Sequence, residues 1–218
     1  MATYTQFPNI GYVQHEFTDK QLAKVREEVT AIQEDFSKAT DAHAKLAGNI
    51  EKEFTLSDKT KLYLEYILMP MARKMYEGSP EYIKKGSHSQ RMPPFYLEST
   101  WVNFQKKYEF NPVHGHTGVY SWVIWLQVPF TNEEELKAGP GNGGNHPVSG
   151  QFAFNYTDCG GTIISHGLQV DKSWENKAIL FPSSMMHCVY PFYSSDDYRI
   201  SISGNFYLKE TAHGQQRR

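Results

Sequence analysis

The chain has 218 residues, 39% of them hydrophobic, and a formal net charge of −2 at pH 7. A chain of this size can bury one substantial core, so we expect a single domain over residues 1–218. Acidic and basic residues are nearly equal in number, whereas a nucleic-acid-binding protein usually has an excess of basic residues. Its two cysteines are too few for a disulfide framework, and no segment is typical of a signal peptide or a membrane span. We therefore expect a cytoplasmic protein without a membrane partner.

Two helices are expected in the N-terminal third of the chain. Apolar residues recur every three or four positions over residues 22–36, which is the period of an amphipathic helix. A second helix is predicted over about 57–77 with a bend at Pro70, and the polar segment 38–53 fits either a loop or a frayed helix. We expect this helical region, about residues 18–78, to support the rest of the fold.

The remaining sequence is rich in β-branched and aromatic residues, which suit packed strands. Short strands separated by turn residues are predicted at 95–104, 119–128, 151–156, 162–164, 168–170, 177–181, 188–190 and 198–203. A series of short strands with turn signals is typical of a barrel or a double-sheet jelly roll. The chain is therefore predicted to be mainly β with N-terminal helices.

The connection at residues 131–150 is polar and rich in glycine and proline. A structureless connection of this length is often an active-site lid. A mobile loop without a function fits the same pattern equally well.

Two histidines separated by one glycine, His114 and His116, are candidate metal ligands. Residues i and i+2 of an extended strand project from the same face, so both imidazoles can reach one ion. His187 follows a predicted strand and turn, and it can supply a third ligand from a distant part of the chain. Three ligands that leave positions open suit the oxygen chemistry of non-haem iron. The alternative for the pair alone is two neutral histidines hydrogen-bonded in an ordinary core.

Arg199 strengthens the metal interpretation, because it lies on a strand that otherwise reads Tyr-x-Ile-x-Ile. Burying a guanidinium without a partner is costly, whereas a carboxylate co-substrate would pair with it through two hydrogen bonds. Ser201 shares its face of the strand and can donate to the same carboxylate. The alternative is a surface salt bridge from Arg199 to Asp196 or Asp197.

Together these residues resemble the Fe(II)/2-oxoglutarate-dependent oxygenase superfamily. More narrowly, the region of about residues 95–208 is similar to a small 2OG-Fe(II) oxygenase branch found in bacteria and their phages. The elements that carry the resemblance are Asn111-Pro-Val-His-Gly-His116, Leu180-Phe-Pro-Ser183, His187 and Arg199-Ile-Ser-Ile-Ser-Gly-Asn205. In a phage protein, the expected location would be the host cytoplasm.

The resemblance implies a double-stranded β-helix, a cupin-like jelly roll, as the catalytic core over about residues 93–208. It implies Fe(II) on the histidines, 2-oxoglutarate as a small-molecule co-substrate with its distal carboxylate on Arg199 and Ser201, and O2 as the oxidant. The expected activity is that of a dioxygenase that hydroxylates a substrate and releases succinate and CO2. Beyond the metal ligands, no catalytic residue is implied.

The first ligand pair departs from the superfamily, which usually has His-x-Asp or His-x-Glu. Two ligand registers are open. In the first, His114, His116 and His187 form a three-histidine site; in the second, His116 and His187 bind with water, and Gly118 stands where a carboxylate would be. We prefer the first register, because i and i+2 geometry brings His114 to the ion without a further assumption.

Four further residues are candidate lining residues of the substrate or co-substrate pocket: Asn103, Tyr120, Trp122 and Asn205. Core packing of the aromatic rings and turn formation by the asparagines are the simpler explanations. The sequence does not identify the substrate, and a peptide side chain, a nucleobase, a sugar or a small metabolite all remain open. Two other protein classes also fit: a cupin-type metal-binding protein without 2-oxoglutarate, and a structural jelly roll whose histidines are incidental.

Overall fold

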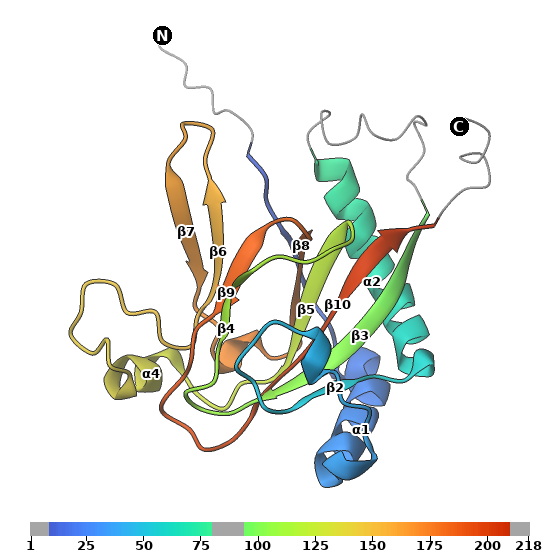
Figure 1. Ribbon diagram of the computed structural model, residues 1–218, viewed down its shortest axis with the longest axis horizontal. Coiled ribbons are helices and arrows are strands. Elements are labelled where there is room, and N and C mark those ends of the chain that lie inside the picture. Colours follow the sequence, from blue (N-terminus) through green and yellow to red (C-terminus); the bar gives the residue numbers. More distant parts are fainter. Residues whose placement is uncertain (1–8, 80–93, 210–218) are drawn as a thin grey trace.

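The computed structural model describes residues 9–79 and 94–209. Within these ranges the strands form two antiparallel sheets (Figure 1). The larger sheet has the strand order β1 (Val13–Glu16), β8 (Lys177–Pro182), β5 (Tyr120–Gln127), β10 (Arg199–Leu208), β3 (Phe95–Gln105) and β2 (Glu53–Thr55). The smaller sheet has the order β4 (Asn111–His114), β9 (Met186–Val189), β6 (Phe152–Thr157) and β7 (Ile163–Leu168). This is a double-stranded β-helix, so the predicted mainly β jelly roll with N-terminal helices is confirmed.

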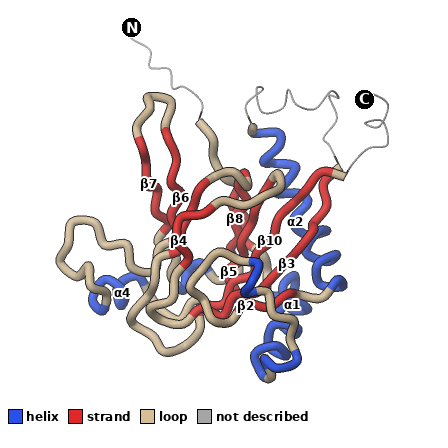
Figure 2. The backbone as a smooth tube through the Cα atoms, viewed as in Figure 1, coloured by secondary structure: helices blue, strands red, loops and turns tan. Residues whose placement is uncertain are grey.

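Two helices, α1 (Asp19–Glu34) and α2 (Asp58–Gly78), pack on one face of the larger sheet (Figure 2). Helix α1 begins at a capping box in which the side chains of Thr18 and Gln21 each bond to the other residue's backbone N–H. Its buried residues repeat with the predicted period, and α2 continues through Pro70. No helix among residues 9–79 and 94–209 is both long and apolar enough to cross a membrane.

Strand β10 shows how the larger sheet separates its two faces. Ile200 and Ile202 are buried in the core that contains the helices, whereas Arg199, Ser201 and Ser203 line a cavity between the two sheets. This alternation follows from the period of two along a strand. The neighbouring strand β3 also alternates, and its cavity-lining residues are Trp101, Asn103 and Gln105. The larger sheet therefore has an apolar face for the helices and a polar face for a site.

Two short elements lie where the sequence predicts none. Strand β2 begins at the last residue of the segment 38–53, expected to be a loop or a frayed helix, and 3-10 turns precede it at Phe36–Lys38 and His43–Lys45. Helix α4 (Asn132–Ala138) begins the 131–150 connection. Elements of three to seven residues are too short to show a periodicity that could predict them. Conversely, the strands predicted at 162–164 and 168–170 belong to one strand, β7.

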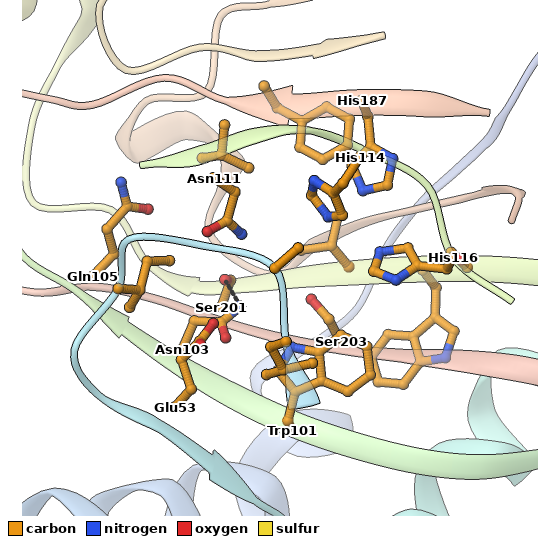
Figure 3. A pocket seen from close by; sticks show the side chains of 18 of the residues that line it. Glu53, Trp101, Asn103, Gln105, Asn111, His114, His116, His187, Ser201 and Ser203 are labelled. Atoms are coloured by element: carbon orange, nitrogen blue, oxygen red, sulfur yellow. Dashed lines mark hydrogen bonds between the residues drawn. The ribbon is translucent and has the colours of Figure 1, made fainter. Parts of the chain in front are cut away.

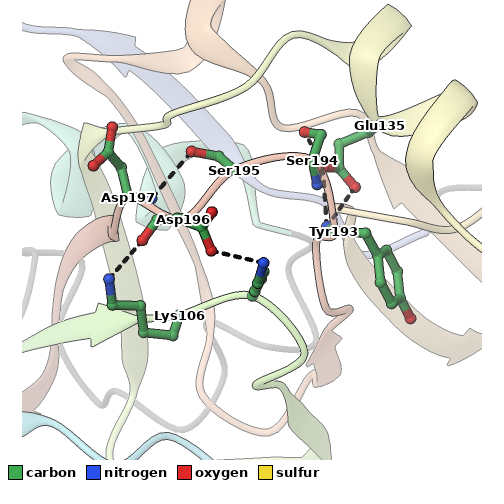
Figure 4. A network of polar contacts seen from close by, with 8 residues as sticks. Lys106, Glu135, Tyr193, Ser194, Ser195, Asp196 and Asp197 are labelled. Atoms are coloured by element: carbon green, nitrogen blue, oxygen red, sulfur yellow. Dashed lines mark hydrogen bonds and ion pairs between the residues drawn. The ribbon is translucent and has the colours of Figure 1, made fainter.

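Helix α4 is hydrogen-bonded to the loop that precedes β10. The buried carboxylate of Glu135 accepts hydrogen bonds from the backbone N–H groups of Tyr193, at 3.0 Å, and Ser194, at 2.7 Å, and from the Ser194 hydroxyl (Figure 4). At the other end of the connection, the carbonyl oxygen of Gly150 accepts from Arg199 Nη1 at 2.6 Å. The 131–150 connection is thus anchored at both ends beside the cavity.

Candidate functional site

The three predicted histidines lie together at one end of the cavity (Figure 3). His114 ends β4 and is the register partner of His187 on β9, so antiparallel pairing places the two rings with centroids 4.3 Å apart. The His116 ring centroid is 4.9 Å from that of His114 and 5.1 Å from that of His187. One ligand atom from each of the three histidines lies within 4.8 Å of the others, a grouping that could hold a metal ion.

His116 reaches the cluster from a turn rather than from the continuous strand that the i and i+2 argument assumes. Strand β4 ends at His114, and the His116 backbone N–H donates to the carbonyl oxygen of Ser183 at 2.9 Å. Ser183 is in the turn between β8 and β9, so one backbone hydrogen bond ties the two ligand-bearing segments together.

Backbone carbonyls orient two of the imidazole rings. His114 Nδ1 lies 2.8 Å from the carbonyl oxygen of Pro112, and His187 Nδ1 lies 3.0 Å from that of Met185. Because a carbonyl oxygen can only accept, each Nδ1 must carry the proton, which leaves the Nε2 lone pair free for a metal. Metal-binding histidines are commonly held in this way.

Burial keeps two of the ligand candidates, His116 and His187, neutral. The pKa of His187 is lowered to about 3, mainly by burial and then by the charge of neighbouring His114. The pKa of His116 is lowered to about 4 for the same two reasons. At neutral pH both imidazoles therefore carry a free lone pair, which is the form that binds metal.

The backbone at Gly118 leaves little room for a side chain. Its backbone has φ +101, and a Cβ built there would lie 2.8 Å from the Phe206 carbonyl oxygen and 3.2 Å from the Tyr207 ring. A carboxylate at this position would therefore be directed against β10 and would require the chain to move.

Arg199 is buried, and neutral oxygens surround its guanidinium. Gln105 Oε1 accepts from Nε at 3.1 Å and from Nη2 at 2.8 Å, while backbone carbonyls of Gly150 and Tyr190 accept from Nη1 and Nη2. Burial lowers its pKa to about 9, and the charge of Glu135 opposes this shift. The alternative of a surface salt bridge is excluded, because Arg199 is buried and the Asp196 carboxylate pairs with Lys107 at 2.6 Å.

The cavity that joins these groups has the polarity that a metal and an anionic co-substrate need. It is lined by the three histidines, Arg199 and Ser201. Three imidazoles suit a divalent transition metal, and a buried cation with only neutral hydrogen-bond acceptors favours an anion. The described residues therefore fit Fe(II) and a carboxylate ligand.

The remaining candidate pocket residues lie in different places. Asn103 lines the cavity and its Nδ2 lies 3.5 Å from Ser201 Oγ, whereas Asn205 accepts from Ser121 Oγ at 2.7 Å and lines an outer groove. Tyr120 packs on the helix side of the sheet, with its ring 5.3 Å from that of Phe95, and is not among the cavity-lining residues.

Trp122 belongs to the helix-side core and also borders the cavity. Its ring lies beside Gly204, where a Cβ would come within 2.7 Å of it. Glu53 and Gln105 also line the cavity, but the sequence does not single them out. The pairing of β2 with β3 brings Glu53 there, and local periodicity could not predict this three-residue strand.

Comparisons with known proteins agree with this geometry. Residues 99–205 match the family model described as "Putative 2OG-Fe(II) oxygenase". No protein with a curated description matches the sequence.

Among solved structures, a Pseudomonas putida prolyl-4-hydroxylase is 13% identical, with 92% of this chain and 94% of that chain covered and a TM-score of 0.57. EctD from S. alaskensis is 15% identical, with 96% and 78% covered and a TM-score of 0.53. AviO1 from Streptomyces viridochromogenes Tue57 is 11% identical, with 93% and 91% covered and a TM-score of 0.53. At these identities the likeness shows a shared fold.

Proposed function

Because this chain belongs to the 2OG-Fe(II) oxygenase family that residues 99–205 match, we propose that it is an Fe(II)- and 2-oxoglutarate-dependent dioxygenase that hydroxylates a substrate carbon. The convergence of His114, His116 and His187 carries the proposal. When bound, Fe(II) and 2-oxoglutarate would together supply the activation of O2, with succinate and CO2 as the co-products. The protein supplies ligand geometry, orientation and exclusion of water.

The three histidines would hold the iron through imidazole nitrogens. Nε2 of His114 and Nε2 of His187 are available because the Nδ1 atoms donate to Pro112 and Met185. Three neutral imidazoles cancel none of the positive charge of a divalent ion, whereas a carboxylate ligand would cancel one unit of it. We therefore expect a dianionic co-substrate to bind much more tightly when the metal is present.

Arg199 and Ser201 would bind the distal carboxylate of 2-oxoglutarate. Gln105 and the Gly150 and Tyr190 carbonyls engage four of the five guanidinium N–H groups, so they fix the plane of the guanidinium. The second N–H of Nη1 has no such partner among the described residues. The Phe130 and Phe192 rings lie 5.8 and 5.4 Å from the guanidinium carbon and shield it from water.

An anaerobic titration tests the proposal. Fe(II) and 2-oxoglutarate added together should give a weak visible charge-transfer band that neither gives alone. Succinate should then form when O2 is admitted. A cupin-type protein without 2-oxoglutarate would bind Fe(II) but show no band, and a structural jelly roll would show neither a band nor a change in melting temperature.

A further inference from the structure

Three buried acceptor oxygens in the cavity have no hydrogen-bond partner among the described residues: Glu53 Oε2, Asn103 Oδ1 and Asn111 Oδ1. An unpartnered buried polar atom is costly, so each points to a missing donor. The co-substrate assigned above cannot supply one, because a carboxylate only accepts hydrogen bonds. An amide can turn its nitrogen toward a carboxylate, but an ionised Glu53 can only accept hydrogen bonds.

Glu53 faces the same side of the sheet as the residues assigned to the co-substrate. It is the register partner of Asn103, which is in turn the partner of Ser201, so the three form a row across β2, β3 and β10. Figure 3 shows this row on one side of the three histidines. The next residue, Phe54, turns to the opposite face and packs in the helix-side core. Glu53 is therefore held in the cavity by the alternation of its strand.

The protein supplies Glu53 with little compensation for burial. Only 2% of Glu53 is exposed. His43 Nδ1 lies 3.6 Å from its carboxylate but donates to the Ile50 carbonyl oxygen at 2.8 Å. The pKa of Glu53 is raised to about 7, mainly by burial; His43 opposes the shift, and Glu109 and Asp41 add to it.

A second hollow lies beside the inner cavity. An outer groove lined by Thr117, Asn205 and Tyr207 shares five lining residues with the inner cavity. The shared residues are Leu46, Ala47, Trp101, His114 and His116. His114, His116 and Trp101 thus border both hollows, so a molecule in the outer groove lies next to the histidine cluster.

We propose that the primary substrate carries an organic cation, a protonated amine or a guanidinium, whose N–H groups bind Glu53. This assignment rests on the proposed function, in which the histidine cluster is the place where the substrate is oxidised. A cation, unlike a neutral donor, also offsets the charge of the buried carboxylate. The carbon to be oxidised then lies between the cationic group and the outer groove, beside the histidines.

The binding test uses the metal-free protein and compares variants, so that it measures how far a preference for cations depends on Glu53. Calorimetric titrations compare butylammonium and butylguanidinium with the size-matched neutral 1-butanol. The cations should bind at least about tenfold more tightly than the alcohol, and Glu53→Gln should remove this preference. Glu51→Gln, which removes an exposed carboxylate two residues away, is the matched control and should keep the preference.

One further variant and a turnover assay complete the test. Glu53→Asp keeps the charge and should retain a preference for cations, which separates loss of charge from loss of folding. The turnover assay measures succinate release by the metal-loaded enzyme. Stimulation by free lysine or arginine would indicate a small metabolite as the substrate. Stimulation by end-blocked peptides that contain these residues would indicate a protein side chain. Cations that bind no better than the alcohol, or an unchanged preference in Glu53→Gln, overturn the inference. An absent charge-transfer band in the wild type overturns the proposed function instead.

Discussion

At the residue scale, the assignment depends on which histidines bind the metal. Replacing His187 by alanine removes a buried imidazole with a free Nε2, and two ligands should not retain iron. We expect His187→Ala to lower bound Fe(II) after anaerobic gel filtration at least about tenfold. His166→Ala removes an exposed histidine of β7 and is the control that should bind iron normally. Normal iron content in His187→Ala would refute the assignment.

Arg199 has the complementary role, because it should affect the co-substrate and not the metal. Arg199→Lys keeps the positive charge but loses the planar fork that Gln105 and the two carbonyls hold. We expect the dissociation constant of 2-oxoglutarate, measured from the charge-transfer band, to rise at least about tenfold while Fe(II) binding is retained. Lys107→Ala, which removes a surface cation paired with Asp196, should change neither. Loss of iron, or an unchanged dissociation constant of 2-oxoglutarate with iron retained, would contradict the assignment.

The sequence identifies the candidate ligands because residue type and spacing are local properties. His114, His116, His187 and Arg199 can be selected in this way, and all four line one cavity. Glu53 cannot, because its relevance arises only when β2 pairs with β3. A single acidic residue after a polar segment carries no signal of its own.

At the element scale, α4 and the 131–150 connection stabilise the cavity near Arg199. Glu135→Gln would replace a buried carboxylate that accepts two backbone N–H groups and a hydroxyl. We expect it to lower the free energy of unfolding by about 1–3 kcal/mol and to weaken 2-oxoglutarate binding, because Gly150 would hold Arg199 less firmly. Denaturant unfolding and the charge-transfer titration measure the two effects.

The matched control for this element is Glu133→Gln, which removes an exposed pair with Lys137 and should cost about 0.5 kcal/mol or less. Equal effects of the two substitutions would show that α4 does not stabilise the Arg199 end of the cavity. The composition of residues 131–150 predicts a loop. It predicts neither helix α4 nor the hydrogen bonds by which Glu135 joins this helix to the loop before β10.

At the scale of the whole molecule, buried histidines should make the metal-free fold sensitive to acid. The pKa values of His116 and His187 are lowered to about 4 and about 3, so between pH 6.5 and 4.5 the unfolded chain binds protons at these residues that the folded chain does not. Stability should therefore decrease as pH falls through this window. Glu53 acts in the opposite direction, because its raised folded pKa makes the folded state bind a proton first.

We expect the thermal unfolding midpoint of the metal-free protein to fall from pH 6.5 to 4.5, and to fall more steeply in Glu53→Gln. A midpoint of Glu53→Gln that is constant or rises over this range would show that the histidines are not buried and neutral in solution.

The fold class and most strands follow from periodicity, because a buried face imposes a repeat on each segment. The order of strands in the two sheets does not, since pairing joins residues as distant as Val13 and Leu180. The same non-local pairing places His114 against His187. The resemblance to a family, rather than any local pattern, therefore supplies the expectation that the ligands meet.

The most direct measurement is the position of a bound metal in crystals soaked with Mn(II) and 2-oxoglutarate without O2, located by anomalous scattering. A single peak should lie about 2.1 Å from Nε2 of both His114 and His187 and from a ring nitrogen of His116. The co-substrate should extend from it to Arg199. A peak that contacts only two histidines, or a co-substrate that lies away from Arg199, would contradict the account.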